Sequence, residues 1–299
     1  MLLQVLDDGT LKNMHVTYFP GLVRFFPAIE CEDGALQDAA TMSIAFKPIE
    51  GSHTSIAVPL RPDTDSLTRV DVNMHGSPTE AYDMGKAYND WFSECLGHRV
   101  IFAYIGSHTR QVLMSVASAE SNKGTWTSSI ADYLPSALSS LVQGQREKIG
   151  FADCAPYLVV SNTSLDNVSS RLSDGSLADI QRFRPNIVVE GAETPWEEDF
   201  WAQLDIGDVT LDLIHNCVRC KSLNIDYETG KPGLGESGQV FKKLQSDRRV
   251  DKAAKYSPVF GRYSFLHGVD QGKVVSIGDE VKVVRRNKDR TVFDWPGLV

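Results

Sequence analysis

The stretch DIGDVTLDLIHNCVRC (205–220) decides how the chain folds, because it joins a strand pattern to a pair of cysteines. Apolar and polar residues alternate over 205–215, which predicts a half-buried β-strand. Cys217 and Cys220 follow directly, in a Cys-x-x-Cys arrangement with Arg219 beside the second thiol. A strand that delivers two thiols and a cation to one place is a candidate site, and the question is what the thiols do.

Three kinds of chemistry suit such a pair. Zinc is the first, since thiolates at this spacing commonly supply half of a tetrahedral site, and His215 would add a third ligand. The other half is missing, because the chain has no second Cys-x-x-Cys and no His-x-x-x-His. A redox disulfide is the second, although the pair leads into the turn-rich 221–233 rather than a helix. One thiolate on a soft metal is the third, and two ordinary partly buried cysteines are the plain alternative.

Further strand patterns surround this stretch. They are APYLVVS (155–161), RFRPNIVVEG (182–191) and SIGDEVKVVRR (276–286), with one helix pattern, NTSLDNVSSRLSDG (162–175), after the first. Many short strands with isolated helices predict a mixed α+β, β-rich protein built on a closed or nearly closed β-barrel rather than a doubly wound sheet. No Gly-x-Gly-x-x-Gly or Walker sequence is present, so no motif supports nucleotide binding.

The first part of the chain also reads as β-rich. Residues 1–6 and 99–106 predict strands, and Asp8-Gly9 is a hairpin-turn dipeptide. Residues 77–97 predict one helix, in which Ser77, Pro78 and Glu80 form the N-terminal cap. The aromatic stripe of that helix and Cys95 are expected to face the core.

The stretch 107–129 turns polar and rich in small residues, which indicates a domain boundary. We therefore expect an N-terminal β-rich domain over 1–127, a barrel domain over 128–284 and a C-terminal tail over 285–299.

Composition excludes several classes of function. With 299 residues and a net charge of −9, the chain is a poor general binder of nucleic acid or anionic membranes. It has no apolar run of the ~18 residues that a membrane span needs, and no secretory signal pattern, so a cytoplasmic protein is expected. The run FKKLQSDRRVDKAAK (241–255) is the basic exception, and we interpret it as a solvated face or as a surface for the acidic patch of an electron donor.

Two short motifs could bind an anion or a heterocycle. In FRPN (183–186), Arg184 and Asn186 occupy alternate positions of an expected strand entry, so an extended backbone would point a guanidinium and an amide to one face. The planar guanidinium of Arg can donate two parallel hydrogen bonds to a phosphate, so FRPN is interpreted as a binding motif for phosphate or a heterocycle. In FADCAP (151–156), Asp153 stands at the mouth of a loop before a strand, although an Asp that caps a turn would look the same.

The order of these motifs resembles the MOSC domain, the module named after the C-terminal part of molybdenum cofactor sulfurase, and most of all its amidoxime-reducing branch. The resemblance runs over roughly 128–284, through FADCAPYLVVS, RFRPNIVVEG, PWEEDFWAQLDIGDVTL, NCVRC, DYETG, SPVFGRY and GKVVSIGDEVKVV. It implies a MOSC β-barrel that holds a pterin-dithiolene molybdenum cofactor. It also implies reduction of N-hydroxylated or N-oxygenated compounds by oxygen-atom removal at molybdenum. The alternative is a non-catalytic cofactor-binding or sulfur-handling protein.

The resemblance also assigns residues. Cys220 matches the metal ligand and Cys217 its neighbour, while Arg184, Asn186 and Arg219 match the residues that bind the cofactor. Asp153 and Cys154, in the matching loop, are also expected to bind the cofactor, and Cys154 stands where the family often has a hydroxyl residue.

Partners follow from the same resemblance. No cysteine spacing for an iron–sulfur centre exists, so electrons are expected from a separate haem or flavin protein. Pyridoxal phosphate binding is a further property that the family resemblance raises. The family's Tyr-Pro-x-Lys-Ser element would precede MLLQV, so an incomplete N-terminal domain is expected, and a mitochondrial location if a segment precedes it.

Overall fold

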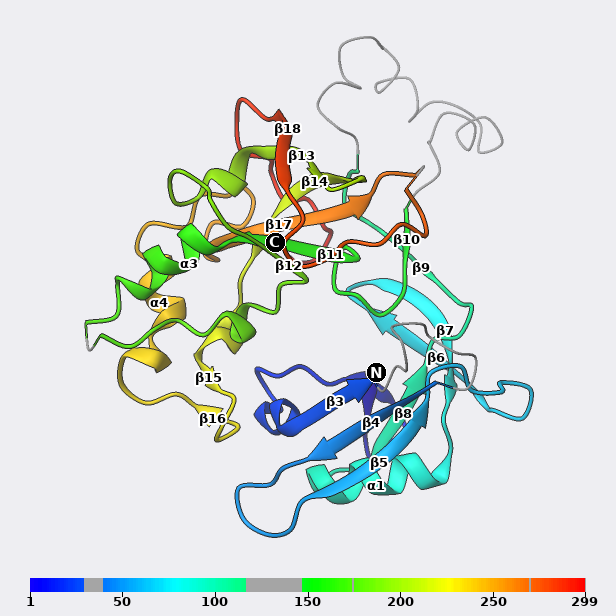
Figure 1. Cartoon of the computed structure of the whole chain (residues 1–299). Coiled ribbons are helices and arrows are strands. Elements are labelled where there is room, and N and C mark those ends of the chain that lie inside the picture. The colour runs from blue at the N-terminus through cyan, green and yellow to red at the C-terminus, as the bar shows by residue number, and fades with distance from the viewer. Residues whose placement is uncertain (30–39, 117–146, 174, 269, 299) are drawn as a thin grey trace. The chain divides into compact units, whose positions relative to one another are not determined.

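The computed structural model describes residues 1–29, 40–116, 147–173, 175–268 and 270–298 (Figure 1). By its internal contacts the chain divides into two compact units. The first unit comprises Met1–Thr109 and Cys220–Phe241, and the second comprises Arg110–Arg219 and Lys242–Val299. The boundary expected at 127/128 lies outside the described residues. Among the described residues, no helix is long and apolar enough to cross a membrane.

The first unit contains two antiparallel sheets and a helix. One sheet has the strand order β2-β1-β8-β7-β6, the other has the order β3-β4-β5, and the short pair β15–β16 is separate. The strands are β1 Leu2–Val5, β2 Leu11–Asn13, β3 Phe25–Ile29, β4 Thr41–Phe46, β5 Thr54–Pro59, β6 Arg69–Met74, β7 Ser77–Asp83, β8 Val100–Tyr104, β15 Ile225–Asp226 and β16 Lys231–Pro232. The helices are α1 Lys86–Leu96 and the 3₁₀ turns η1 Pro20–Arg24, η6 Lys221–Asn224 and η7 Gly235–Gly238. The expected strands at 1–6 and 99–106 are confirmed.

The helix predicted over 77–97 is wrong in its first half. Ser77–Asp83 is strand β7, whose residues 77–82 pair with β6. His75 and Gly76 both have positive φ, at 55° and 76°, and this tight turn folds the two strands into a hairpin. Cross-strand pairing therefore overrides the apparent capping box, and the helix begins only after Gly85.

The second half of that prediction is correct. Phe92 is buried, and Tyr88 and Trp91 pack against the same core cluster from helix α1. Cys95, expected in the core, is only partly buried, with its Sγ 3.9 Å from the hydroxyl of Thr54.

The second unit is built on a six-stranded sheet, nearly closed and barrel-like, with the order β12-β11-β17-β14-β13-β18. This confirms the prediction of a β-rich protein with few helices, built on a nearly closed barrel (Figure 1). Its strands are β11 Tyr157–Ser161, β12 Ile187–Val189, β13 Trp201–Ile206, β14 Val209–Val218, β17 Val259–Leu266 and β18 Val281–Arg286, and the pair β9 Arg110–Gln111 and β10 Lys148–Ile149 is separate. The helices are α3 Asn162–Ser169, η4 Ile180–Phe183, η5 Glu197–Phe200 and α4 Val240–Gln245, of which α4 starts in the first unit.

Neighbouring strands of this sheet differ in their relative direction. All neighbours are antiparallel except β11 and β12, which are parallel and joined through helix α3. Gly261 in β17 has φ +82°, and a Cβ there would lie 2.7 Å from Val160 of β11. Only glycine allows these two strands to approach so closely.

The end of the chain is part of this unit. Phe293 and Trp295 are fully buried, and the backbone N–H of Phe293 donates to the buried carboxylate of Asp251 at 2.9 Å. The range expected as a tail, 285–299, therefore contributes two large side chains to the core.

A buried carboxylate pair lies in the turn η5. Glu198 and Asp199 are both fully buried, and Asp199 accepts two hydrogen bonds of 2.8 Å from Arg248. Glu198 accepts one from Ser164 at 2.7 Å, and its second oxygen has no partner among the described residues. Burial raises the pKa of Glu198 from 4.5 to about 7.

Glu198→Gln should stabilise the protein at high pH and leave it unchanged at low pH. A raised carboxyl pKa means that the folded state keeps a proton which the unfolded chain loses, so stability falls as pH rises from 4.5 to about 7 and stays reduced above that. The upper limit of the gain at pH 8 is about 3 kcal/mol, and it should vanish near pH 4. Urea unfolding at both pH values measures this, with exposed Glu190→Gln as the control. An equal gain for Glu198→Gln at both pH values would contradict the assignment.

Candidate functional site

The loop 151–156 before β11 is held by a buried arginine. Arg110, only 1% exposed, donates from Nε to the carbonyl of Gly150 at 3.0 Å and from Nη2 to the carbonyls of Ala152 and Asp153. Its guanidinium also lies 5.5 Å from the ring centre of Trp295. Bonds from one buried cation to successive carbonyls fix the loop, so Asp153 is presented on a rigid backbone.

Two thiols and a phenol gather beside this loop. Cys154, Cys217 and Tyr263 are 1%, 3% and 4% exposed, and Tyr263 donates from Oη to the carboxylate of Asp153 at 3.3 Å. Burial raises the pKa of both thiols, and the charge of Asp153 raises that of Cys154 further. Both cysteines are therefore buried thiols whose pKa values lie above the ordinary value.

Arg219 connects the cysteine pair to the FRPN motif. It donates from Nη1 to Sγ of Cys217 at 3.0 Å and from Nη2 to the carbonyl of Phe183 at 2.6 Å. Its own N–H donates to the carbonyl of Pro258 at 2.8 Å, so both its backbone and its side chain are anchored. The charge of Arg219 lowers the pKa of Cys217 against the larger effect of burial.

Cys220 has a different environment from Cys217. It is exposed, and its Sγ lies 3.0 Å from the hydroxyl of Ser222 and 3.9 Å from that of Thr17. It stands at the N-terminal end of the turn η6, in extended conformation. The two cysteines therefore differ: Cys217 is buried and bonded to Arg219, whereas Cys220 is exposed and accessible to a ligand.

The backbone of FRPN differs from its prediction. Arg184 ends the turn η4 with φ 55° and ψ 45°, in the left-handed region, so the extended geometry expected for Arg184 and Asn186 is wrong. The reason is local: Asp179 caps η4 by accepting from the N–H of Gln181 at 2.9 Å, and the chain must turn before β12 can start.

Asn186 has a structural role as well as an exposed position. Its side-chain oxygen accepts from the N–H of Leu158 at 2.8 Å, and its own N–H donates to the carbonyl of Leu158 at 2.9 Å. These two bonds continue the β11–β12 ladder by one residue. The side-chain nitrogen of Asn186 is not used in these two bonds and could donate to a ligand. The side chain of Arg184, two residues earlier in the chain, is exposed.

The zinc interpretation gains no support. His215 is buried, with Nε2 2.7 Å from the carbonyl oxygen of Ser115 and 3.4 Å from the carboxylate of Asp294. Nowhere in the described ranges do three His, Cys, Asp or Glu side chains gather as metal ligands.

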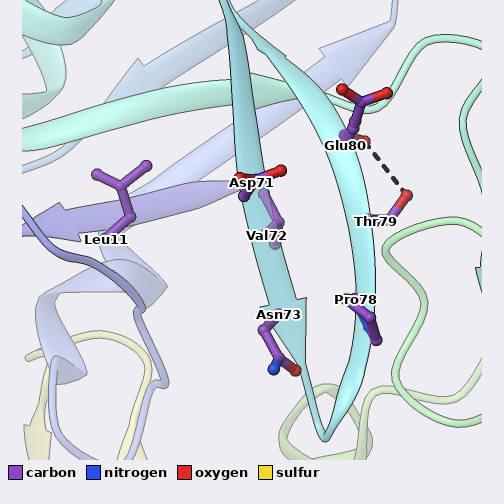
Figure 2. Close-up of a pocket in the computed structure, with 7 residues that line it drawn as sticks. All are labelled: Leu11, Asp71, Val72, Asn73, Pro78, Thr79 and Glu80. Atoms are coloured by element: carbon purple, nitrogen blue, oxygen red, sulfur yellow. Dashed lines mark hydrogen bonds between the residues drawn. The ribbon is translucent and has the colours of Figure 1, made fainter.

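A separate pocket of about 390 Å³ lies on the β6–β7 hairpin of the first unit. Figure 2 shows Asp71 and Asn73 on one strand and Pro78, Thr79 and Glu80 on the other, with the hydrogen bond from the Thr79 hydroxyl to the Glu80 carbonyl. None of the predicted site residues lines this pocket, so it is not part of the candidate site.

Sequence reasoning missed Arg110 and Tyr263. Arg110 stands in a polar stretch that resembles a linker, and nothing local distinguishes it from a surface residue. Tyr263 and its neighbour Arg262 did carry a signal, because Arg262 interrupts the apolar strand 258–266. A lone cation in such a run indicates a buried side chain with hydrogen-bond partners, and Arg262 is fully buried, with Nη1 donating to the side chain of Asn216 and Nη2 to the carbonyl of Leu213.

Comparison with known proteins identifies relatives of the later part of the chain. The MOSC domain family matches residues 146–282. Human mitochondrial amidoxime-reducing component 1 is 34% identical over 137 residues, which are 46% of this chain and 39% of that protein. Rat mitochondrial amidoxime reducing component 2 is 33% identical over 141 residues, again 46% of this chain and 39% of the relative. The chain thus matches well under half the length of these two relatives.

A third relative matches a longer part of the chain. Molybdenum cofactor sulfurase of Oryza sativa subsp. japonica is 23% identical over 221 residues, which cover 71% of this chain and 24% of that protein. The names of these three relatives give no support to pyridoxal phosphate binding.

Proposed function

We propose that this chain, whose residues 146–282 match the MOSC domain family, binds molybdenum cofactor and reduces N-hydroxylated compounds. The proposal is supported by the similarity to amidoxime-reducing components and by the chemistry of the cysteine pair. In this proposal Cys220 is the protein ligand of molybdenum, and the electrons come from a separate protein.

The observation that carries the proposal is the asymmetry of Cys217 and Cys220. A soft metal is bound by a thiolate, and the thiol that serves must be accessible and free to lose its proton to the metal. Cys217 is buried, and its Sγ accepts a hydrogen bond from Arg219 at 3.0 Å, whereas Cys220 is exposed, with its Sγ 3.0 Å from the hydroxyl of Ser222. The donor set therefore fits one metal thiolate better than a disulfide or a zinc pair.

The remaining residues fit the organic part of the cofactor. Arg184 offers an exposed guanidinium, which suits a phosphate group, and Asn186 offers the amide nitrogen that the β ladder leaves unused. Arg219 adds positive charge one residue before the ligand, and Asp153 is presented by the loop that Arg110 fixes. Cys154 belongs to the same loop and is buried, so we expect its side chain to pack in the core rather than to donate a hydrogen bond to the cofactor.

The reaction requires two electrons and two protons for each substrate. The N–O bond of the N-hydroxylated compound breaks, the nitrogen gains one proton, and the hydroxyl takes the other proton and leaves as water. When bound, the cofactor supplies the two-electron chemistry, and the protein supplies binding, orientation and electrostatics. The residues of this chain hold the cofactor through Cys220 and balance its negative charge through Arg184 and Arg219.

A non-catalytic cofactor carrier or sulfur-handling protein is the second candidate. The match to molybdenum cofactor sulfurase favours it, because that match covers 71% of this chain and so extends beyond the MOSC domain. Cys154 and Ala155 also favour it, since neither supplies the hydroxyl hydrogen bonds, each worth about 1 kcal/mol, that would tighten the cofactor.

Metal analysis and a turnover assay separate the candidates. We expect the protein, produced in cells that make molybdenum cofactor, to contain molybdenum and pterin in equal amounts and to reduce benzamidoxime with reduced methyl viologen as donor. Bound molybdenum without turnover would select the carrier. If wild-type protein contains neither molybdenum nor pterin, both the reductase and the carrier function are wrong.

A further inference from the structure

Residues 242–256 form a basic segment on a protein of net charge −9. The segment has six cationic and two acidic side chains. Four of the cations are exposed: Lys242, Arg249, Lys252 and Lys255. Tyr256, at the end of the segment, is 80% exposed. The prediction of a solvated basic face is therefore correct for these residues but wrong for Arg248, which is buried with Asp199.

The exposed cations are not neutralised locally. Within the part of the chain that the structure describes, none of the four forms an ion pair, whereas exposed Lys86, Lys282 and Arg286 each have a carboxylate partner. Of the two carboxylates of the segment itself, Asp247 pairs with Arg171 and Asp251 is buried. The segment therefore presents positive charge to solvent.

Internal bonds hold the segment in one shape. Gln245, in the last turn of α4, donates from its side chain to the carbonyl of Tyr256 at 2.7 Å, which brings the two ends of the segment together. The carboxylate of Asp251 accepts from the N–H groups of Ala253 and Ala254 at 2.9 and 3.1 Å. Because the backbone is already ordered, the cations form a fixed pattern that a partner can bind without ordering a loop.

The segment leads directly to the candidate site. It ends two residues before Pro258, whose carbonyl accepts from the N–H of Arg219 at 2.8 Å. Arg219 precedes Cys220, the proposed metal ligand. The N–H of Val259 also donates to the carbonyl of Arg248 at 2.9 Å, so the segment is bonded to strand β17 as well.

We propose that the basic segment 242–256 is the docking surface for an acidic electron-donor protein; this rests on the proposed reductase function, which needs such a donor. Charge complementarity around an exposed aromatic side chain is typical of protein interfaces and raises the association rate. A membrane is a poorer fit, because the apolar side chains of α4, including Leu244, are buried in the protein. Extended nucleic acid is a poorer fit because four charges are set in a net acidic chain.

Charge removal with a matched control tests this surface. The test variant is Lys242→Gln/Arg249→Gln/Lys252→Gln/Lys255→Gln. The control, Lys273→Gln/Lys282→Gln/Arg286→Gln/Lys288→Gln, removes the same charge from exposed positions elsewhere in the second unit. The probes are the acidic soluble domain of a b-type cytochrome and an acidic flavodoxin, and the readouts are the dissociation constant by titration calorimetry and the association rate by stopped flow.

We expect the wild type to bind at least one probe and the test variant to bind it about 10- to 100-fold more weakly, mainly through slower association. The control should change binding less than about threefold, and added salt should remove most of the difference. Equal losses in both variants, no loss in the test variant or no binding of either probe by wild type would overturn the proposal. So would a loss confined to binding of anionic vesicles or single-stranded DNA.

The failure of this inference differs from that of the proposed function. Turnover with reduced methyl viologen needs no docked protein, so it should be equal in wild type and test variant. Binding of the probes, in turn, is measured whether or not molybdenum is present. If wild-type protein shows no turnover with reduced methyl viologen, the proposed reductase function is wrong. The measured binding of the probes is not affected by that result.

Discussion

Cys220→Ala should lower the molybdenum content of the purified protein to background and abolish reduction of N-hydroxylated substrate. Loss of a residue that merely supports a metal ligand commonly costs 10- to 100-fold in affinity or activity, so loss of the ligand itself should cost more than about 100-fold. Cys220 is exposed, and its contacts are two hydroxyls at 3.0 and 3.9 Å, so its removal should leave the fold intact. Mass spectrometry for molybdenum, with thermal unfolding as the folding control, measures both effects.

Cys217→Ala is the matched control for this experiment. It removes the other thiol of the pair, together with the bond from Arg219 at 3.0 Å, and should cost stability because the site is buried. Most of the molybdenum should nevertheless remain. If Cys217→Ala empties the site as fully as Cys220→Ala does, the two thiols act as a pair and the single-ligand proposal is wrong. Full occupancy in Cys220→Ala would be equally decisive against it.

The barrel was predictable because its signals are local. The stretch 155–161 became β11, and 205–215, predicted as one strand, became the end of β13, a turn at Gly207 and Asp208, and most of β14. In the first unit, the turn at Asp8-Gly9 became the β1–β2 hairpin. In each case the period of the side chains and the chemistry of the turn agree, and no distant contact opposes them.

The predictions that failed depend on distant or competing contacts. The capping pattern at Ser77 was overridden by pairing with β6, which also explains why the helix starts nine residues later, at Lys86. At Arg184 the turn η4 prevented the extended backbone on which the convergence of Arg184 and Asn186 was argued. A short motif alone does not reveal which of two local conformations the rest of the chain stabilises.

Only part of the candidate site could be predicted. The difference between Cys217 and Cys220 came from family resemblance, and their burial agrees with it. Arg110 could not be predicted, because its bonds to the loop 151–156 join residues about forty positions apart. Long-range contacts of this kind leave no periodic signal in the sequence.

Arg248→Met should be the most destabilising single change in the basic segment. Arg248 and its partner Asp199 are 3% and 0% exposed, and removal of Arg248 leaves a buried carboxylate that keeps a bond from Arg290 at 2.7 Å. Breaking one side of a buried ion pair typically costs about 3–5 kcal/mol, which corresponds to a fall of about 6–20 °C in melting temperature. Burial lowers the pKa of Arg248, and the charge of Asp199 opposes that shift.

The adjacent Arg249 provides the control, since it is exposed and Arg249→Met should change stability by less than about 0.5 kcal/mol. The double variant Arg248→Met/Asp199→Asn tests the cause. If the cost arises from an uncompensated charge, neutralising Asp199 should recover part of it, and the two changes should be less than additive. If the cost instead arises from lost packing of Arg248 over the ring of Trp196, 4.0 Å away, the second change should add its own penalty in full. Urea unfolding of wild type, Arg248→Met, Asp199→Asn and the double variant distinguishes these outcomes. A cost below about 1 kcal/mol for Arg248→Met would contradict the role of the pair in holding η5 to the barrel.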